Sequence, residues 1–261
     1  MDNFYHYIIS AAAAKERREA VVKHFRQQGI QPHLMDAIMG IDLSEEIKQK
    51  LVDSRACLKP GAIGCALSHL KVFKEFLKSQ EATVCVFEDD VRLTPDFIYE
   101  IPKIRKFMGG VNTPAVLVLY KTNSKIKSAY NLSNKRSVLR TLGASASHGY
   151  VINRKAAANI LEAQTPLKFE IDAWEIYDKL GLADIYCTNF DYVFLDKVLS
   201  TKSLIENGTP VEYIDFLAKR VNRKILFQEM AARHGPVGKV KLQLRRVQRH
   251  LRELYYDKDE I

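Results

Sequence analysis

The sequence has 261 residues, of which 47% are hydrophobic and 27% are charged. These are the proportions of an ordinary globular protein, and the length allows one α/β domain with a tail or two small domains. No apolar run approaches the roughly 20 residues of a membrane-spanning helix, and the first residues do not have the pattern of a signal peptide. The four cysteines lie far apart without a C-x-x-C pair, which argues against a zinc ribbon or a disulfide scaffold and favours a reducing cytosol.

The formal net charge of +9 belongs to the C-terminal part of the chain. Residues 216–256 contain eleven Lys or Arg and two acids, so this stretch alone carries +9 and the rest sums to zero. The basicity of the protein therefore belongs to its tail.

The first third of the chain reads as alternating strands and helices. Residues 4–9 and 33–35 are short apolar segments typical of strands, and 11–28 form a predicted helix that ends at Gly29. A loop with Pro60, Gly61 and Gly64 then opens a helix that reaches Ser79. Small residues in this loop allow another backbone to approach closely.

The segment from Thr83 to Asp90 is the most informative in the sequence. An uncharged strand is closed by three consecutive carboxylates, Glu88, Asp89 and Asp90. Ligands bind at the carboxyl ends of strands in open α/β sheets. Side-chain alternation would place Glu88 and Asp90 on one side and turn Asp89 to the other. Such a pair suits Mg²⁺ or Mn²⁺. The alternative is a solvated turn that caps the helix or loop opened by Thr94-Pro95-Asp96.

The second half continues the alternation, with predicted strands at 115–120, 148–152, 184–187 and 192–195, and helices at 154–163 and from 169 to 180. Residues 121–140 are polar and basic, and we interpret them as a long mobile loop or a substrate-facing excursion. The whole pattern predicts an α/β fold, with a domain over residues 1–210 and a helical tail over 211–261.

Within the tail, five apolar residues step by four and three along one helix face, a row that we call the seam: Val240, Leu244, Val247, Leu251 and Leu254. Three interpretations are open. The seam packs on the protein's own core or on a second subunit as a homodimer, the helix lies on an anionic membrane surface, or the charges bind nucleic acid. We expect no nucleic acid, because the charges come without a recognised binding motif.

Taken together, these segments resemble glycosyltransferase family 25, the bacterial lipooligosaccharide β-glycosyltransferases. The resemblance covers roughly residues 4–205 and is most specific in two segments, G-C-A-L-S-H at 64–69 and E-D-D at 88–90. It also includes Tyr7–Ser10 with Arg17-Arg18, the stretch from Asp36 to Gly40, 149–157 and Asp172.

The resemblance implies a GT-A-like fold (a Rossmann-like mixed sheet flanked by helices) and an inverting transfer of galactose or glucose from a UDP-sugar to a lipooligosaccharide or lipopolysaccharide glycan. It implies Mn²⁺ or Mg²⁺ on Asp90, Glu88 and Asp89, which would neutralise the leaving UDP. Asp172 is the candidate base for the acceptor hydroxyl, or else a helix-terminal acid. Trp174 stacks on a sugar or belongs to the core.

The resemblance also implies a set of residues that contact the substrates. They are Ser10, Arg17, Asp36, Gly64, Ser68, His69, Glu88, Asp89, His148 and Trp174. On its residues alone, His69 is more typical of a helix residue bonded to a neighbour than of a ligand. The expected location is the inner face of the bacterial inner membrane, reached through the basic tail. The rival functions are a metal-dependent phosphoryl or nucleotidyl transferase and a basic membrane- or nucleic-acid-binding module.

Overall fold

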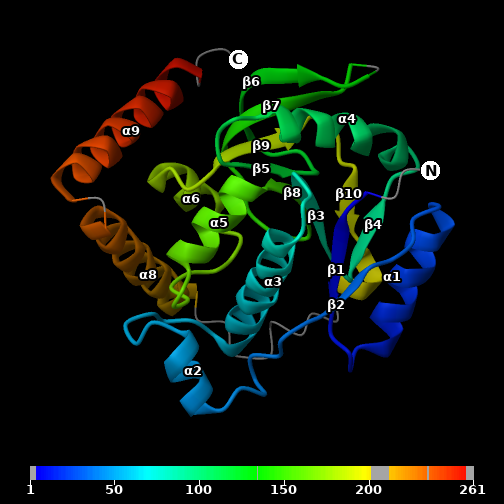
Figure 1. Ribbon diagram of the computed structural model, residues 1–261, viewed down its shortest axis with the longest axis horizontal. Helices are drawn as coiled ribbons and strands as arrows, with labels where there is room; N and C mark the ends of the chain where they lie inside the picture. Colours follow the sequence, from blue (N-terminus) through cyan, green and yellow to red (C-terminus); the bar gives the residue numbers. More distant parts are fainter. Residues whose placement is uncertain (1–3, 134, 201–211, 234, 257–261) are drawn as a thin grey trace.

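The computed structural model describes residues 4–133, 135–200, 212–233 and 235–256 (Figure 1). Its centre is an eight-stranded mixed sheet in the order β2-β1-β3-β8-β5-β9-β7-β6. The strands are β1 (His6–Ser10), β2 (Leu34–Asp36), β3 (Thr83–Glu88), β5 (Ala115–Val118), β6 (Ser124–Asn131), β7 (Ser137–Gly143), β8 (Gly149–Asn153) and β9 (Asp184–Thr188). A small antiparallel pair, β4 (Val91–Leu93) with β10 (Val193–Leu195), stands beside it.

Three neighbouring strands at one end of the sheet run in the same direction. β1 pairs in parallel with β2 on one side and with β3 on the other, whereas β8 joins β3 antiparallel. The carboxyl ends of β1, β2 and β3 therefore meet at one edge, where open α/β sheets bind ligands.

Helices cover both faces of the sheet (Figure 1). One face packs against α1 (Lys15–Gln27) and α4 (Phe97–Gly110), the other against α3 (Pro60–Lys78), α5 (Arg154–Ala163) and α6 (Trp174–Leu180). The short helices α2 (Glu45–Leu51) and α7 (Lys197–Ser200) complete this part, and α2 buries no residue. The predicted α/β fold, a mixed sheet flanked by helices, is confirmed.

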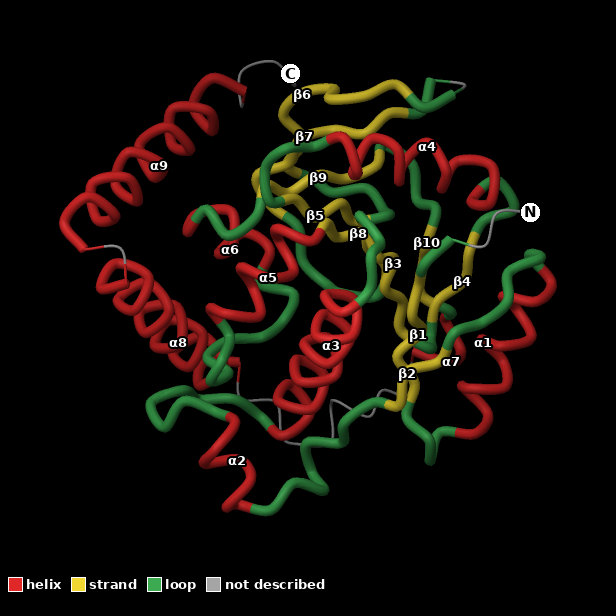
Figure 2. Tube along the Cα trace, in the orientation of Figure 1, coloured by secondary structure: helices red, strands yellow, loops and turns green. Residues whose placement is uncertain are grey.

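The interpretation of residues 121–140 as a mobile loop is wrong. They contain β6 and the start of β7, a hairpin that joins the main sheet because β7 pairs with β9 (Figure 2). Val138 is fully buried and Tyr130 packs against Phe107 of α4. The pattern was hidden because register shifts interrupt the pairing of β6 with β7, so the apolar residues do not alternate regularly.

Two long helices follow residue 211, α8 (Glu212–Arg233) and α9 (Gly235–Tyr256). α8 packs on the rest of the chain, since Leu226 and Met230 belong to the core cluster of α3, α5 and α6. The predicted domain boundary at residue 210 lies outside the described residues.

Polar side chains also hold α8, at a contact that we call the α8 joint: Asn222 with Cys57, and Glu229 with Arg55 and Lys168. Asn222 is completely buried, accepts from the backbone N–H of Cys57 at 2.8 Å and donates to its carbonyl at 2.8 Å. Glu229 pairs with Arg55 at 2.7 Å and with the buried Lys168 at 3.2 Å. The joint ties α8 to the loop that precedes α3.

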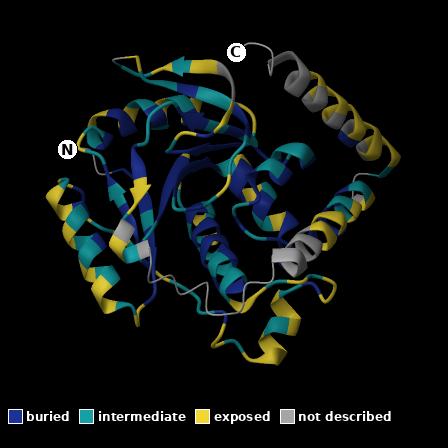
Figure 3. Cartoon of the chain, turned by 180° about the vertical axis from the view of Figure 1, so that it is seen from behind, coloured by how far each residue is buried: buried dark blue, intermediate teal, exposed yellow. Residues whose placement is uncertain are grey.

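The seam on α9 does not pack on the protein's own core. Leu242 is the residue of α9 in the core cluster, whereas Val240, Leu244, Val247 and Leu251 are 55–58% exposed (Figure 3). Own-core packing is therefore wrong for these four residues, and the side chain of Leu254 lies outside the described set. In the described chain we found no helix with the length and apolarity that crossing a bilayer requires.

Candidate active site at the end of β3

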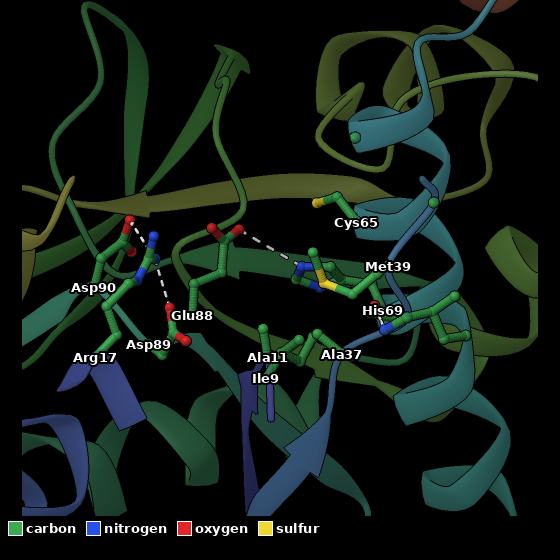
Figure 4. Close-up of a pocket in the computed structure, with 14 residues that line it drawn as sticks. Ile9, Ala11, Arg17, Ala37, Met39, Cys65, His69, Glu88, Asp89 and Asp90 are labelled. Carbon is green, nitrogen blue, oxygen red and sulfur yellow. Dashed lines mark hydrogen bonds and ion pairs between the residues drawn. The ribbon is translucent and has the colours of Figure 1, made fainter. Parts of the chain in front are cut away.

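A cavity opens at the shared edge of β1, β2 and β3 (Figure 4). Its walls come from the end of β1, from Arg17 on α1, from residues 37–40 after β2 and from the first turns of α3. Glu88, Asp89 and Asp90 all line it. The prediction that Asp89 turns to the other side is therefore wrong: β3 ends at Glu88 and a turn follows, so strand alternation no longer applies.

Two glycines and a serine fix one wall. A Cβ on Gly64 would lie 2.4 Å from the carbonyl oxygen of Ile38, and one on Gly40 would lie 1.7 Å from that of Pro60. The Ser68 hydroxyl accepts from the Ile38 N–H at 2.7 Å and donates to the Gly64 carbonyl at 2.6 Å. The predicted close approach at Gly64 is real, but the approaching backbone belongs to the protein itself. Gly64 and Ser68 shape the wall.

Asp89 is fully engaged by neighbouring side chains. Its two carboxylate oxygens meet the Ser10 hydroxyl at 2.8 Å and the Arg17 guanidinium at 2.5 Å. Arg17 also reaches Asp90 at 3.0 Å, so it bridges the two aspartates (Figure 4). Buried charges require such pairing. Ser10 and Arg17 therefore act directly on the acidic motif.

Asp90 differs from Asp89 because one of its two carboxylate oxygens has no hydrogen-bond partner among the described residues. Its Oδ1 is buried and makes no hydrogen bond within the described part of the chain. Burial, together with the charges of Glu88 and Asp89, raises the pKa of Asp90 to about 6 against the opposing effect of Arg17. A carboxylate held in this way gains from a cation.

Glu88 belongs to a second group of side chains on the α3 side. It accepts a hydrogen bond from the Ser147 hydroxyl at 2.6 Å, and its Oε1 lies 3.6 Å from Nε2 of His69. His69 is almost completely buried, and its Nδ1 is 2.8 Å from the Tyr150 hydroxyl. Burial acts to raise the pKa of Glu88, but His69 and Ser147 outweigh it, so the pKa lies below its usual value.

His69 Nε2 is also buried without a hydrogen-bond partner among the described residues. Together with the Cys65 thiol and Glu88 it forms a group whose ligand atoms lie within 4.8 Å of one another. Burial, followed by the charges of Glu88 and Asp172, raises the pKa of the Cys65 thiol. The thiol therefore stays protonated and is a poor nucleophile.

The loop between β7 and β8 presents Ser147 to Glu88. Ala146 in this loop has φ = 72°, a left-handed conformation that costs an alanine about 1 kcal/mol or more. Its carbonyl accepts from the Tyr120 hydroxyl at 2.8 Å and from the indole N–H of Trp174 at 2.7 Å. Its N–H donates to Asp172 at 3.0 Å. Three side chains thus maintain a strained turn beside the cavity.

Trp174 is fully buried between Tyr150 and Tyr177. The predicted stacking on a sugar is therefore wrong, and the core alternative holds. Asp172 precedes α6 without capping it, since the N-cap is Ala173 and makes no side-chain cap bond. Its Oδ2 bonds the loop that presents Ser147 to Glu88, and Asp172 itself does not line the described cavity. Its role as a base stays a prediction.

The remaining predicted residues lie around the cavity rather than in its wall. Asp36 ends β2 with an exposed side chain that pairs with Arg18 at 2.7 Å. His148 stacks on Tyr120 with a ring separation of 4.3 Å, and burial lowers its pKa, so it is neutral near pH 7.

Sequence reasoning did not single out Cys65, Tyr120, Ser147 or Tyr150. Cys65 lies within the G-C-A-L-S-H segment and Tyr150 within the 149–157 segment, whereas Tyr120 and Ser147 are recognisable only from their contacts.

The acidic group fits a divalent cation. Three carboxylates and one guanidinium leave two net negative charges when Asp90 is ionised. The buried Oδ1 of Asp90 offers a lone pair, and hard cations prefer carboxylate oxygens. Asp90 is better placed as a ligand than Asp89, because Ser10 and Arg17 already occupy both oxygens of Asp89.

Residues 4–174 match the family model described as glycosyltransferase family 25 (LPS biosynthesis protein). The chain belongs to this family. It is 29% identical over 190 residues to a glycosyltransferase of Haemophilus influenzae, covering 69% of this chain and 65% of that protein. It is 28% identical over 169 residues to the lacto-N-neotetraose biosynthesis glycosyltransferase LgtE of Neisseria meningitidis, covering 60% and 59%. The chain thus spans slightly less than two thirds of these relatives.

A human relative, 34% identical over 101 residues, is named an inactive family 25 member, and the match covers 35% of this chain and 17% of the human protein. Membership of the family and catalytic activity are therefore separate questions. A solved Bacillus anthracis glucose-1-phosphate thymidylyltransferase aligns over 78% of this chain and 77% of its own, with 10% identity and a TM-score of 0.37.

Proposed function

We propose that this protein transfers a hexose from UDP-galactose or UDP-glucose to a lipooligosaccharide or lipopolysaccharide glycan, with inversion and with a divalent metal. The observation that carries the proposal is the cavity at the end of β3. It brings both specific segments of the family resemblance, 64–69 and 88–90, into one wall. The family's description as an LPS biosynthesis protein and the name of the Neisseria relative support the glycan class of the acceptor.

The cavity offers groups of opposite charge for a nucleotide diphosphate. Asp90 and Glu88 would hold Mg²⁺ or Mn²⁺, which supplies charge neutralisation for the diphosphate of the donor and the leaving UDP. Arg17 is the cationic side chain in the described wall of the cavity, and its planar fork suits phosphate oxygens as well as carboxylates. Fold and metal use of the GT-A type are part of this proposal.

Inversion requires a base on the acceptor side that takes the proton of the attacking hydroxyl. We keep Asp172 in this role, because its carboxylate bonds Ala146 in the loop that presents Ser147 to the cavity residue Glu88, and that bond uses one of its two oxygens. Asn at this position can still accept the bond from Ala146. Asp172→Asn therefore separates proton transfer from loop support.

The test measures release of UDP from UDP-galactose and UDP-glucose by the whole protein, with and without Mn²⁺. Slow release from one of the two donors that depends on the metal supports the proposal, and a suitable oligosaccharide acceptor should accelerate it. Release of pyrophosphate or phosphate instead would indicate the phosphoryl or nucleotidyl transferase. If the protein neither bound nor hydrolysed UDP-galactose or UDP-glucose, that result would contradict the proposal.

A further inference from the structure

The outer face of α9 carries an apolar row that nothing in the described chain covers. Val240, Leu244, Val247 and Leu251 are each more than half exposed, and Val237 extends the row at 67% exposure. The spacing of three and four residues keeps them on one side of the helix. Single exposed apolar residues are ordinary, but a continuous row marks an interaction surface.

The opposite face of the same helix holds it against the protein. Leu242 is 4% exposed and belongs to the core cluster, and at about 100° per residue it lies across the helix from the row. The Arg245 guanidinium lies directly over Gly181, where a Cβ would be 1.6 Å from Nη1. The row is therefore displayed outward by a docked helix (Figure 3).

The charge of this segment indicates the chemistry of its partner. Residues 237–251 contain five Lys or Arg and no acid. Among those with described side chains, Lys239 and Arg245 are exposed. An amphipathic helix with one apolar face and basic residues on its other sides matches the boundary between anionic headgroups and acyl chains.

We propose that α9 binds the surface of an anionic lipid bilayer, with the exposed seam residues inserted at the headgroup boundary and the helix parallel to the membrane. A seam-to-seam dimer is less favourable, because this segment carries five Lys or Arg and no acid in each copy, so the two helices would repel each other. Nucleic acid would leave the apolar row without a role. The inference rests on α9 alone and does not depend on the chemistry proposed for the cavity; the membrane expected in a cell is the cytoplasmic leaflet.

The test is flotation of the full chain with vesicles of phosphatidylcholine containing 30% phosphatidylglycerol, compared with phosphatidylcholine alone. We expect binding to the anionic vesicles that weakens as salt rises. The double variant Leu244→Asp with Leu251→Asp should bind at least about tenfold more weakly. The control is Gln228→Asp with Ala232→Asp on exposed positions of α8, which makes the same change in charge and should reduce binding much less.

Circular dichroism and thermal melting establish that each variant is folded. Equal loss in the seam variant and the control would overturn the proposal, since charge alone would then explain binding. Absence of binding by the wild type would also overturn it. A wild-type dimer in sedimentation analysis that the seam variant abolishes, without vesicle binding, would assign the seam to a second copy of the chain.

Discussion

The cavity at the end of β3 and the α8 joint are both built from buried polar side chains, but they differ in how completely these are bonded. In the joint, Asn222 uses both ends of its amide on Cys57, and Lys168 meets two carbonyls and Glu229. In the cavity, Asp90 Oδ1 and His69 Nε2 are buried without a hydrogen-bond partner among the described residues.

A buried polar atom without a partner costs roughly 1–3 kcal/mol, so native structures contain few of them. The complete network of the joint stabilises the fold, whereas the incomplete network of the cavity is ready for a ligand. Proteins commonly accept such a cost where binding requires it. Variants in the cavity should therefore affect activity more than stability, and variants in the joint should do the reverse.

Asp90→Asn should have the largest effect. We expect donor hydrolysis to fall by a factor of about 100 or more, because a metal ligand and its charge are lost. The melting temperature should stay the same or rise, because a charge crowded by Glu88 and Asp89 is removed. Glu19→Gln, an exposed acid on α1, is the matched control and should change neither quantity. An active Asp90→Asn protein would remove Asp90 from the proposed site.

His6 tests whether a buried polar atom without a partner affects stability when it lies outside the cavity. Its Nε2 is buried without a hydrogen-bond partner in the described chain, and His6 does not line the cavity. Burial lowers the pKa of His6 to about 4. The unfolded chain binds a proton below about pH 6.5 and the folded chain does not, so stability should be lost as the pH falls from 6.5 towards 4.

The loss should approach about 3 kcal/mol at most, from 1.36 kcal/mol for each pKa unit. The measurement is urea unfolding between pH 4 and 7, with His6→Phe as the comparison. A plot of unfolding free energy against pH that is equally steep in both proteins would show that His6 does not cause the acid sensitivity.

Asn222→Ala should break the joint. The N–H and carbonyl of Cys57 would lose their partners, and we expect the unfolding free energy to drop by about 2 kcal/mol. The specific activity of the folded fraction should stay within about twofold of the wild type, because the cavity is unchanged. Gln228→Ala, exposed on the same helix, is the control. A large loss of activity at full stability would mean that the joint takes part in the reaction.

Tyr150→Phe should have the smallest effect of the four. It removes the hydroxyl that bonds Nδ1 of His69 and leaves the ring in place. We expect roughly 1 kcal/mol of stability to be lost and activity to fall by a few-fold, because this bond fixes the tautomer and orientation of His69. Unchanged donor kinetics would show that His69 serves only the fold.

Much of the fold was predictable because its elements have clear periodicity. The helix over 154–163 has the predicted bounds, and the acidic strand ends where the carboxylates begin. The hairpin β6–β7 was not predictable, because its bulges disturb the alternation of apolar and polar residues on which strand prediction depends. The helices α2 and α4 were also not predicted as such, although a helix or loop after Thr94 was considered.

The site was predictable as a set of residues but not as a set of contacts. Ser10, Arg17, Asp89 and Asp90 do meet, because β1, α1 and β3 share one edge of the sheet. The pairing of His69 with Tyr150 joins residues 81 positions apart, and no local pattern indicates it. The exposure of the seam likewise depends on which face of α9 packs inward, and periodicity alone does not determine that.

The most direct test of the central claim is a calorimetric titration of UDP into the wild type and into Asp90→Asn, each with and without Mn²⁺. We expect UDP to bind the wild type in the presence of Mn²⁺ and to bind much more weakly without the metal. Asp90→Asn should lose the metal-dependent part of the binding. Equal UDP binding by both proteins, or binding indifferent to Mn²⁺, would contradict the assignment of the cavity at the end of β3.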